Sequence, residues 1–133
     1  MDSLTKKDAS LLNALSLAFV GDGVWTLFVR DYFCKHTDFK NGNLHRLTTK
    51  FVKASFQAQA LERLPLNDEE IQIARRARNV HNNTVAKNAS LTDYKKATSF
   101  EAVIGYLYLI GDFQRLNDFM SIFIADLDSS LKK

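Results

Sequence analysis

Apolar residues recur along this chain at the spacing of α-helices, and no stretch alternates strictly between apolar and polar positions as a half-buried strand does. The pattern predicts helices over about residues 9–34, 44–64, 67–78, 90–110 and 113–131. The sequence contains no internal repeat, and no interdomain linker separates these segments. We therefore expect an all-α protein with a single domain over residues 1–133.

Turn and capping residues support these limits. Pro65 disfavours helix in the residue before it, so the second helix should end there. Asn67 and Glu70 have the spacing of a capping box at the start of the third helix. The polar segment 79–90, NVHNNTVAKNAS, is expected on the surface, either as a functional loop or as a plain connector.

Composition narrows the class of protein only slightly. The 133 residues are 46% hydrophobic and 25% charged, and the net charge of +3 permits an anionic partner without requiring one. No segment looks able to span a membrane, and the start MDSLTKKDAS lacks a secretory pattern, so we expect a cytoplasmic protein or a mature organellar form. A single cysteine, Cys34, excludes an internal disulfide and a cysteine-based metal site.

Two acids interrupt apolar helical segments. Asp22 lies in LAFVGDGVW between Gly21 and Gly23, and Glu101 lies in KKATSFEAVIGYLYL one turn before Gly105. An unpaired carboxylate buried on such a face would cost several kcal/mol or more. Glycine weakens a helix interior by about 1 kcal/mol relative to alanine, and close approach of another helix or a ligand would explain why it is present.

Crossing of the two helices at their glycines would bring Asp22 and Glu101 together. Two carboxylates in one apolar pocket repel unless they share a proton or bind a cation, and carboxylate oxygens without softer ligands favour Mg²⁺ or Mn²⁺. The alternative is that each acid is satisfied by an arginine or a backbone group. His36, His45 and His81 follow no triad or zinc spacing, so we do not expect nucleophilic or zinc chemistry.

The segments that carry these acids resemble a known family. LSLAFVGDGVWTLFVRDYF is similar to the signature helix of the ribonuclease III catalytic domain, and KKATSFEAVIGYLYL is similar to its second acidic motif. LHRLTTKFVKASFQAQALERL resembles the helix between them. The run RRARN and the absence of room for a double-stranded RNA-binding domain favour the Mini-ribonuclease III branch.

The resemblance implies a dimeric, helical catalytic domain that hydrolyses double-stranded RNA with Mg²⁺, or Mn²⁺, held by Asp22 and Glu101 as catalytic residues. In that branch the substrate is the precursor of 23S ribosomal RNA. Other family acids fall on Leu15, Ala18 and Thr98 here, which predicts weaker metal binding. The alternative function is a catalytically inactive RNA-binding module or a helical interaction protein.

Basic residues suggest where RNA would bind. We expect the duplex backbone to contact two groups, Arg75, Arg76, Arg78, Asn79 and Lys87 in the first and His45, Arg46 and Lys50 in the second. A solvated helix end is the alternative for the first group. The apolar face around Phe19, Trp25 and Phe28 is a candidate dimer interface, and ordinary core positions are the alternative there.

Overall fold

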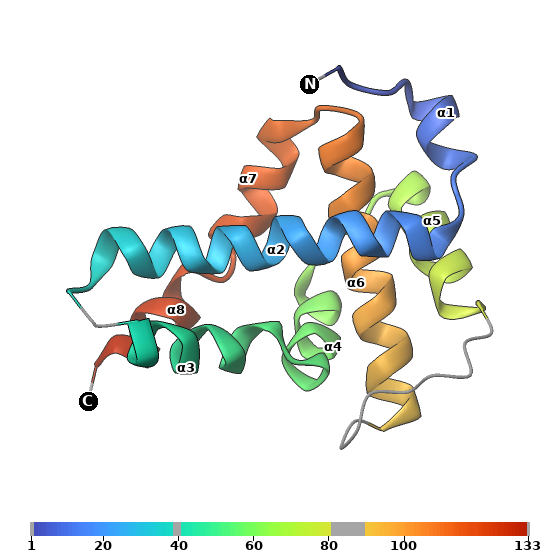
Figure 1. The fold of residues 1–133 in the computed structure, drawn as a ribbon. Coiled ribbons are helices and arrows are strands. Elements are labelled where there is room, and N and C mark those ends of the chain that lie inside the picture. Colours follow the sequence, from blue (N-terminus) through green and yellow to red (C-terminus); the bar gives the residue numbers. More distant parts are fainter. Residues whose placement is uncertain (1, 39–40, 81–89, 133) are drawn as a thin grey trace.

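In a computed structural model of the protein, which describes residues 2–38, 41–80 and 90–132, the chain is a bundle of helices (Figure 1). The described residues contain no strand, so the all-α prediction is confirmed. The helices are α1 (Lys6–Ser10), α2 (Ala14–His36), α3 (Asn41–Val52), α4 (Ala54–Arg63), α5 (Asp68–Arg78), α6 (Leu91–Leu109), α7 (Phe113–Ser121) and α8 (Ile124–Leu131).

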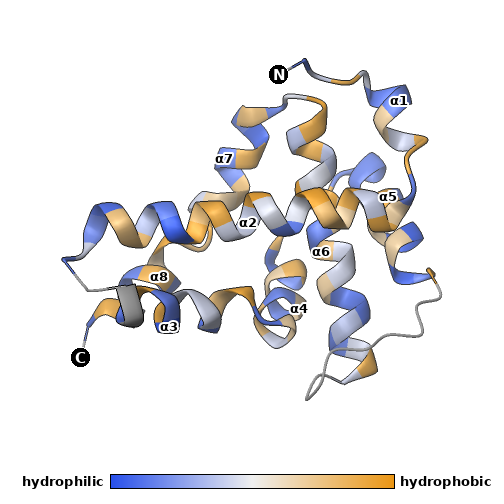
Figure 2. Ribbon diagram, in the orientation of Figure 1, coloured by the Kyte–Doolittle hydropathy of each residue, from blue (hydrophilic) through white to orange (hydrophobic). Residues whose placement is uncertain are grey.

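The long helix α2 spans the molecule and crosses α6 (Figure 1). Among the described residues, this pair has the most extensive contact between any two helices. Helices α4 and α5 pack on α6, and α3 lies along α2. Figure 2 shows a hydrophobic stretch of α2 where this helix passes α6. The α2–α6 pair therefore forms the frame on which the other helices are placed.

Local sequence signals set most helix ends. The Asn13 side chain accepts a hydrogen bond from the Leu15 backbone N–H before α2, and the Ser90 hydroxyl accepts one from Asp93 before α6. The predicted capping box of Asn67 and Glu70 is present at α5. Gly111, with φ of +74°, takes the left-handed conformation that ends α6.

Three predicted helices are broken where the sequence has no glycine or proline. The segment predicted over 9–34 divides between α1 and α2, because Asn13 caps a new helix that starts at Ala14. The segment predicted over 44–64 divides at Lys53, between α3 and α4, and the segment predicted over 113–131 divides between α7 and α8. Near the break at Lys53 the Trp25 indole N–H donates to the Phe51 carbonyl at 2.8 Å, which satisfies an oxygen that a continuous helix would use internally. Tertiary contacts therefore set this boundary.

The core centres on Trp25, which is fully buried. Its ring lies edge-on to Phe100 and Phe123, with centroid separations of 5.1 and 5.4 Å, so it joins α2 to α6 and to the start of α8. The other large side chains with almost no exposure are Phe33, Phe119, Leu17, Ile104, Leu107, Leu127, Val29 and Val103. No helix within the described ranges is long and apolar enough to cross a membrane.

Candidate active site

Glycines set the distance between α2 and α6 at the crossing. A Cβ atom on Gly21 would lie 1.7 Å from the Glu101 carbonyl oxygen, and one on Gly105 would lie 1.9 Å from the Leu17 carbonyl oxygen. Both positions therefore exclude any larger side chain. The predicted close approach holds for Gly21 and Gly105, whereas a Cβ on Gly23 would meet nothing within 4 Å.

This crossing brings the two acids together. The Asp22 and Glu101 carboxyl groups lie within hydrogen-bonding reach of each other, with Asp22 exposed and Glu101 partly buried. Burial, followed by the Asp22 carboxyl, raises the pKa of Glu101 to about 8, and the Gln57 amide opposes this shift. The pair therefore needs a shared proton or a cation at neutral pH.

A third acid, Glu70, is paired with an arginine, which is the alternative that the sequence left open for Asp22 and Glu101. Glu70 is 1% exposed, and Arg115 donates to both of its carboxylate oxygens, at 2.5 and 2.6 Å. The Asn67 backbone N–H also donates to it at 2.9 Å. In the described part of the chain, no such ion pair forms with Asp22 or Glu101. An arginine therefore satisfies Glu70, which the sequence indicated only as a capping residue, whereas the two expected acids form no ion pair with a described residue.

The donor set at the crossing suits a hard divalent cation. Mg²⁺ is commonly held by one or two carboxylates and keeps several water molecules, and the open side at Asp22 gives room for them. No group of three or more His, Cys, Asp or Glu side chains suitable for a metal occurs among the residues that the structure describes. Two carboxylates can therefore form a minimal magnesium site here, but not a fully protein-ligated one.

Gln57 contacts this pair from α4. Its side chain is 2% exposed, and its Nε2 donates to Glu101 Oε2 at 3.4 Å. Gln57 was not predicted from the sequence as a site residue. A signal was available in the polar residue at the start of the alanine-rich segment QAQAL, of which Ala58 and Ala60 are also buried.

Comparison with known proteins assigns the chain to a family. The ribonuclease III domain matches residues 15–112. A Mini-ribonuclease 3 of Clostridium tetani is 44% identical over 126 residues, which cover 92% of this chain and 83% of that protein. The chain belongs to the ribonuclease III family. This membership confirms the resemblance that the acidic motifs indicate, and it makes the chain an endoribonuclease.

A second relative and a solved structure support the same family and fold for this ribonuclease III family member. A Mini-ribonuclease 3 of a Thermoanaerobacter species is 40% identical over 127 residues, covering 94% of this chain and 89% of that protein. An X-ray structure of a Fusobacterium nucleatum protein is similar with a TM-score of 0.81 at 28% identity, covering 87% of this chain and 94% of that one. The fold prediction is thereby confirmed at the level of the ribonuclease III domain.

At three positions where the resemblance places acids of the ribonuclease III family, this chain has residues without a carboxylate, namely Leu15, Ala18 and Thr98. Ala18 is buried in the core and Leu15 is partly buried. Thr98 is 7% exposed, and its hydroxyl donates to the Tyr94 carbonyl at 2.9 Å. None of the three side chains supplies a carboxylate, so Asp22 and Glu101 remain the acids at this site.

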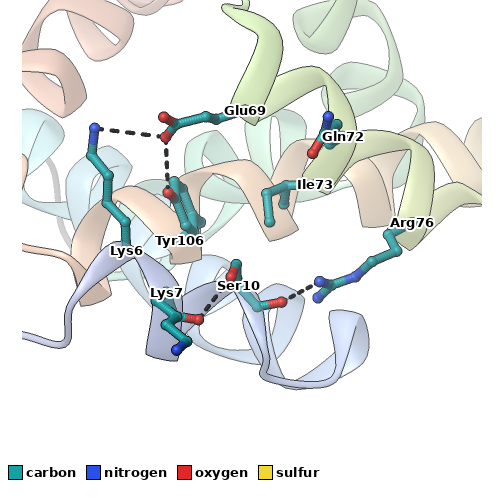
Figure 3. Close-up of a pocket in the computed structure, with 8 residues that line it drawn as sticks. All are labelled: Lys6, Lys7, Ser10, Glu69, Gln72, Ile73, Arg76 and Tyr106. Atoms are coloured by element: carbon teal, nitrogen blue, oxygen red, sulfur yellow. Dashed lines mark hydrogen bonds and ion pairs between the residues drawn. The ribbon is translucent and has the colours of Figure 1, made fainter.

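The structure separates the arginines expected to bind RNA. Arg76 donates to the backbone carbonyls of Ser10 and Leu12, and Figure 3 shows it reaching from α5 to the first of these. Its guanidinium therefore holds the connection between α1 and α2. Arg75 and Arg78 are exposed and form no ion pair with a described residue.

The remaining predicted RNA contacts lie on separate helices. Asn79 is the exposed C-cap of α5, whereas His45, Arg46 and Lys50 are exposed on α3. Helices α3 and α5 lie toward opposite ends of α2 (Figure 1). The two groups are therefore not brought into one cluster, and Lys87 falls outside the described residues.

A cavity of about 420 Å³ lies between α1, α5 and α6, and neither catalytic candidate lines it. Figure 3 shows the residues that surround it. Lys6 and the Tyr106 hydroxyl both contact Glu69 there, at 3.6 and 3.2 Å. Because these polar groups satisfy one another, we assign this cavity no part in the reaction.

The candidate dimer face needs one correction. Trp25 is fully buried and belongs to the core, and Phe28 is partly buried, whereas Phe19 is 82% exposed. Leu27, which is 68% exposed, was not predicted from the sequence to belong to this face. Phe19, Gly23 and Leu27 follow one another at four-residue intervals, so they lie on one exposed face of α2.

Proposed function

We propose that this ribonuclease III domain, spanning residues 1–133, hydrolyses phosphodiester bonds of double-stranded RNA with Mg²⁺ held by Asp22 and Glu101, Mn²⁺ being the alternative ion. The observation that carries the proposal is the meeting of these two acids, without an ion pair to any described residue, beside a solvent-open side of the α2–α6 crossing. A divalent ion supplies the positive charge that the pair otherwise takes from a proton.

The chemistry follows from the positions of the two acids. A bound divalent ion lowers the pKa of a coordinated water and stabilises charge on the leaving oxygen. Glu101, fixed on the buried helix α6, anchors the site, and the exposed Asp22 carboxylate faces the side from which a large substrate can approach. Water oxygen bonds to phosphorus as the bond to the 3′ oxygen breaks, which leaves a 5′-phosphate and a 3′-hydroxyl.

Two copies of this chain would cut the two strands of a duplex. The exposed face of Phe19, Gly23 and Leu27 belongs to the same helix as Asp22 and offers a self-complementary apolar contact. Because Gly23 has open space in front of it, a second copy of α2 can approach its backbone closely. A homodimer built on this face places two active sites beside one RNA duplex.

Exposed basic and polar side chains hold the RNA backbone. Arg75, Arg78 and Asn79 at the end of α5 form one contact, and His45, Arg46 and Lys50 on α3 form the other. Their separation toward opposite ends of α2 suits a rod-like ligand better than a small anion. Arg76, whose guanidinium is bound to backbone carbonyls, contributes by supporting this region.

The similarity to Mini-ribonuclease 3 proteins leads us to infer a natural substrate, the double-stranded stem of a 23S ribosomal RNA precursor, and a cytoplasmic location. A transcript of that stem should be cut at a defined position, whereas a duplex of unrelated sequence should be cut more slowly or at many positions. Equal cleavage of both would argue against a dedicated ribosomal role.

The decisive experiment uses a long double-stranded RNA with and without Mg²⁺. Wild-type protein should cut only with the ion, and Asp22→Asn should lose cleavage while it keeps its fold and RNA affinity. Asp31→Asn is the matched control, since Asp31 lies on the same helix and only pairs with Lys35 at 3.0 Å. Cleavage by Asp22→Asn at the wild-type rate would refute the metal role, and RNA binding without any cleavage would indicate an inactive binding module.

A further inference from the structure

Gln57 is the buried polar residue of α4 that contacts the proposed metal site. Its side chain is 2% exposed, and its amide nitrogen is 3.4 Å from Glu101 Oε2. A buried amide without a hydrogen-bond partner destabilises a protein, so a buried glutamine is usually retained where it bonds another group. Here the partner is the carboxylate of a proposed catalytic residue.

Other buried polar side chains have structural partners instead. The hydroxyls of Thr48 and Thr98 donate to carbonyls of their own helices, and Ser99 donates to the Ala74 carbonyl at 2.7 Å. Glu70 is bound by Arg115. Of the buried polar residues within the described ranges, Gln57 is the one whose side chain contacts the Asp22–Glu101 pair.

The chemistry of an amide suits this position. A neutral N–H donor fixes one oxygen of Glu101 and leaves the other oxygen able to face Asp22 and a cation. An arginine would occupy both oxygens, as Arg115 does at Glu70, and its charge would replace the metal. An apolar residue of the same size would fill the space but leave the carboxylate free to rotate.

We propose that Gln57 is a positioning residue that holds the Glu101 carboxylate in the orientation needed to bind the divalent ion together with Asp22. This inference rests on the proposed function, because it needs Asp22 and Glu101 to be metal ligands. It adds a third helix, α4, to the site that α2 and α6 form. Partners that orient metal ligands typically change metal affinity about 10- to 100-fold when they are removed.

The test measures Mn²⁺ binding directly, through the free-ion signal in electron paramagnetic resonance, without RNA. Gln57→Met keeps the volume and removes the donor, and it should weaken Mn²⁺ binding by about 10-fold or more while the protein stays folded. Gln57→Asn keeps the amide but shortens its reach and should weaken binding as well. Gln59→Met is the matched control, because Gln59 is exposed on the same helix and should leave the affinity unchanged.

A measurement on the wild-type protein covers the case in which the substituted chains do not fold. The Gln57 side-chain amide resonance should shift in a Mg²⁺ titration, with the same midpoint as resonances around Asp22. The proposal would be overturned if folded Gln57→Met or Gln57→Asn protein bound Mn²⁺ with wild-type affinity. It would also be overturned if the Gln57 amide resonance did not shift when Mg²⁺ was added.

A separate substitution distinguishes failure of this inference from failure of the proposed function. If Asp22→Asn loses Mn²⁺ binding and Gln57→Met does not, the metal site stands and Gln57 has no positioning role. If Asp22→Asn also binds Mn²⁺ like the wild type, the metal site itself is wrong.

Discussion

Gly21 of α2 lies directly against the backbone of Glu101 in α6, so closely that a Cβ atom would come within 1.7 Å of the Glu101 carbonyl oxygen. The glycine beside one acid therefore sets the position of the other. Gly105 has the same relation to α2, where a Cβ would also come within 2.8 Å of the Gly21 nitrogen. Fold and site thus depend on the same contact.

We predict that Gly21→Ala disrupts the protein at this crossing. The added methyl group meets backbone atoms, which cannot move aside as a flexible side chain could, so the loss should exceed the roughly 1–3 kcal/mol usual for overpacking. Urea unfolding followed by circular dichroism measures it. Gln59→Ala is the control, since Gln59 is exposed on α4 and its substitution should change stability by less than about 0.5 kcal/mol. Equal losses in the two variants would contradict the packing argument.

We also predict that stability depends on pH through Glu101 when metal is removed. Burial and Asp22 raise the pKa of Glu101 from 4.5 to about 8, so the folded chain binds this proton more tightly than the unfolded chain. The contribution of Glu101 is therefore fully present below about pH 4.5 and is lost as pH rises through about 8. Urea unfolding in EDTA from pH 5 to pH 8 should show the decline, and Mg²⁺ should restore more stability at pH 8 than at pH 5.

Glu101→Gln provides the reference for that measurement, because its amide does not titrate. The decline in the free energy of unfolding between pH 5 and pH 8 should be smaller in this variant than in the wild type. Parallel curves for the two proteins would show that Glu101 does not hold a proton in the folded state.

The sequence predicted the parts of the site that depend on local pattern. Helical periodicity placed Asp22 and Glu101 on two helices, and the glycines beside them indicated where those helices cross. The capping box of Asn67 and Glu70 was readable because it depends on residues close in the chain. Resemblance to the ribonuclease III family added the role of the acids.

Other features depend on tertiary contacts and were not readable. Nothing local in the sequence distinguishes Trp25, which is fully buried, from Phe19, which is 82% exposed, since both are aromatic residues of one apolar helix. The break at Lys53 lies beside a carbonyl that Trp25 binds from another helix. Gln57 likewise acquires its role from a residue 44 positions away in the chain.

A charge on the exposed apolar face of α2 should separate the proposed dimer. We predict that Leu27→Asp gives a monomer in sedimentation velocity and lowers cleavage of both strands, because burying an unpaired carboxylate at an interface costs several kcal/mol. Phe113→Asp is the matched control, since Phe113 is 53% exposed but lies on α7. A Leu27→Asp protein that sediments like the wild type would place the dimer contact elsewhere or exclude it.

The arginines of α5 should divide into two classes. Arg75→Ala combined with Arg78→Ala should weaken RNA binding and flatten its dependence on salt, because fewer counterions are then released from the duplex, while stability should change by less than about 0.5 kcal/mol. Arg76→Ala should lower stability instead, by about 0.5–1.5 kcal/mol, because the Ser10 and Leu12 carbonyls lose their charged donor. Fluorescence anisotropy at several salt concentrations and urea unfolding measure the two effects. If Arg76→Ala changes the salt slope as much as the Arg75 and Arg78 pair, its guanidinium contacts RNA as well as the backbone.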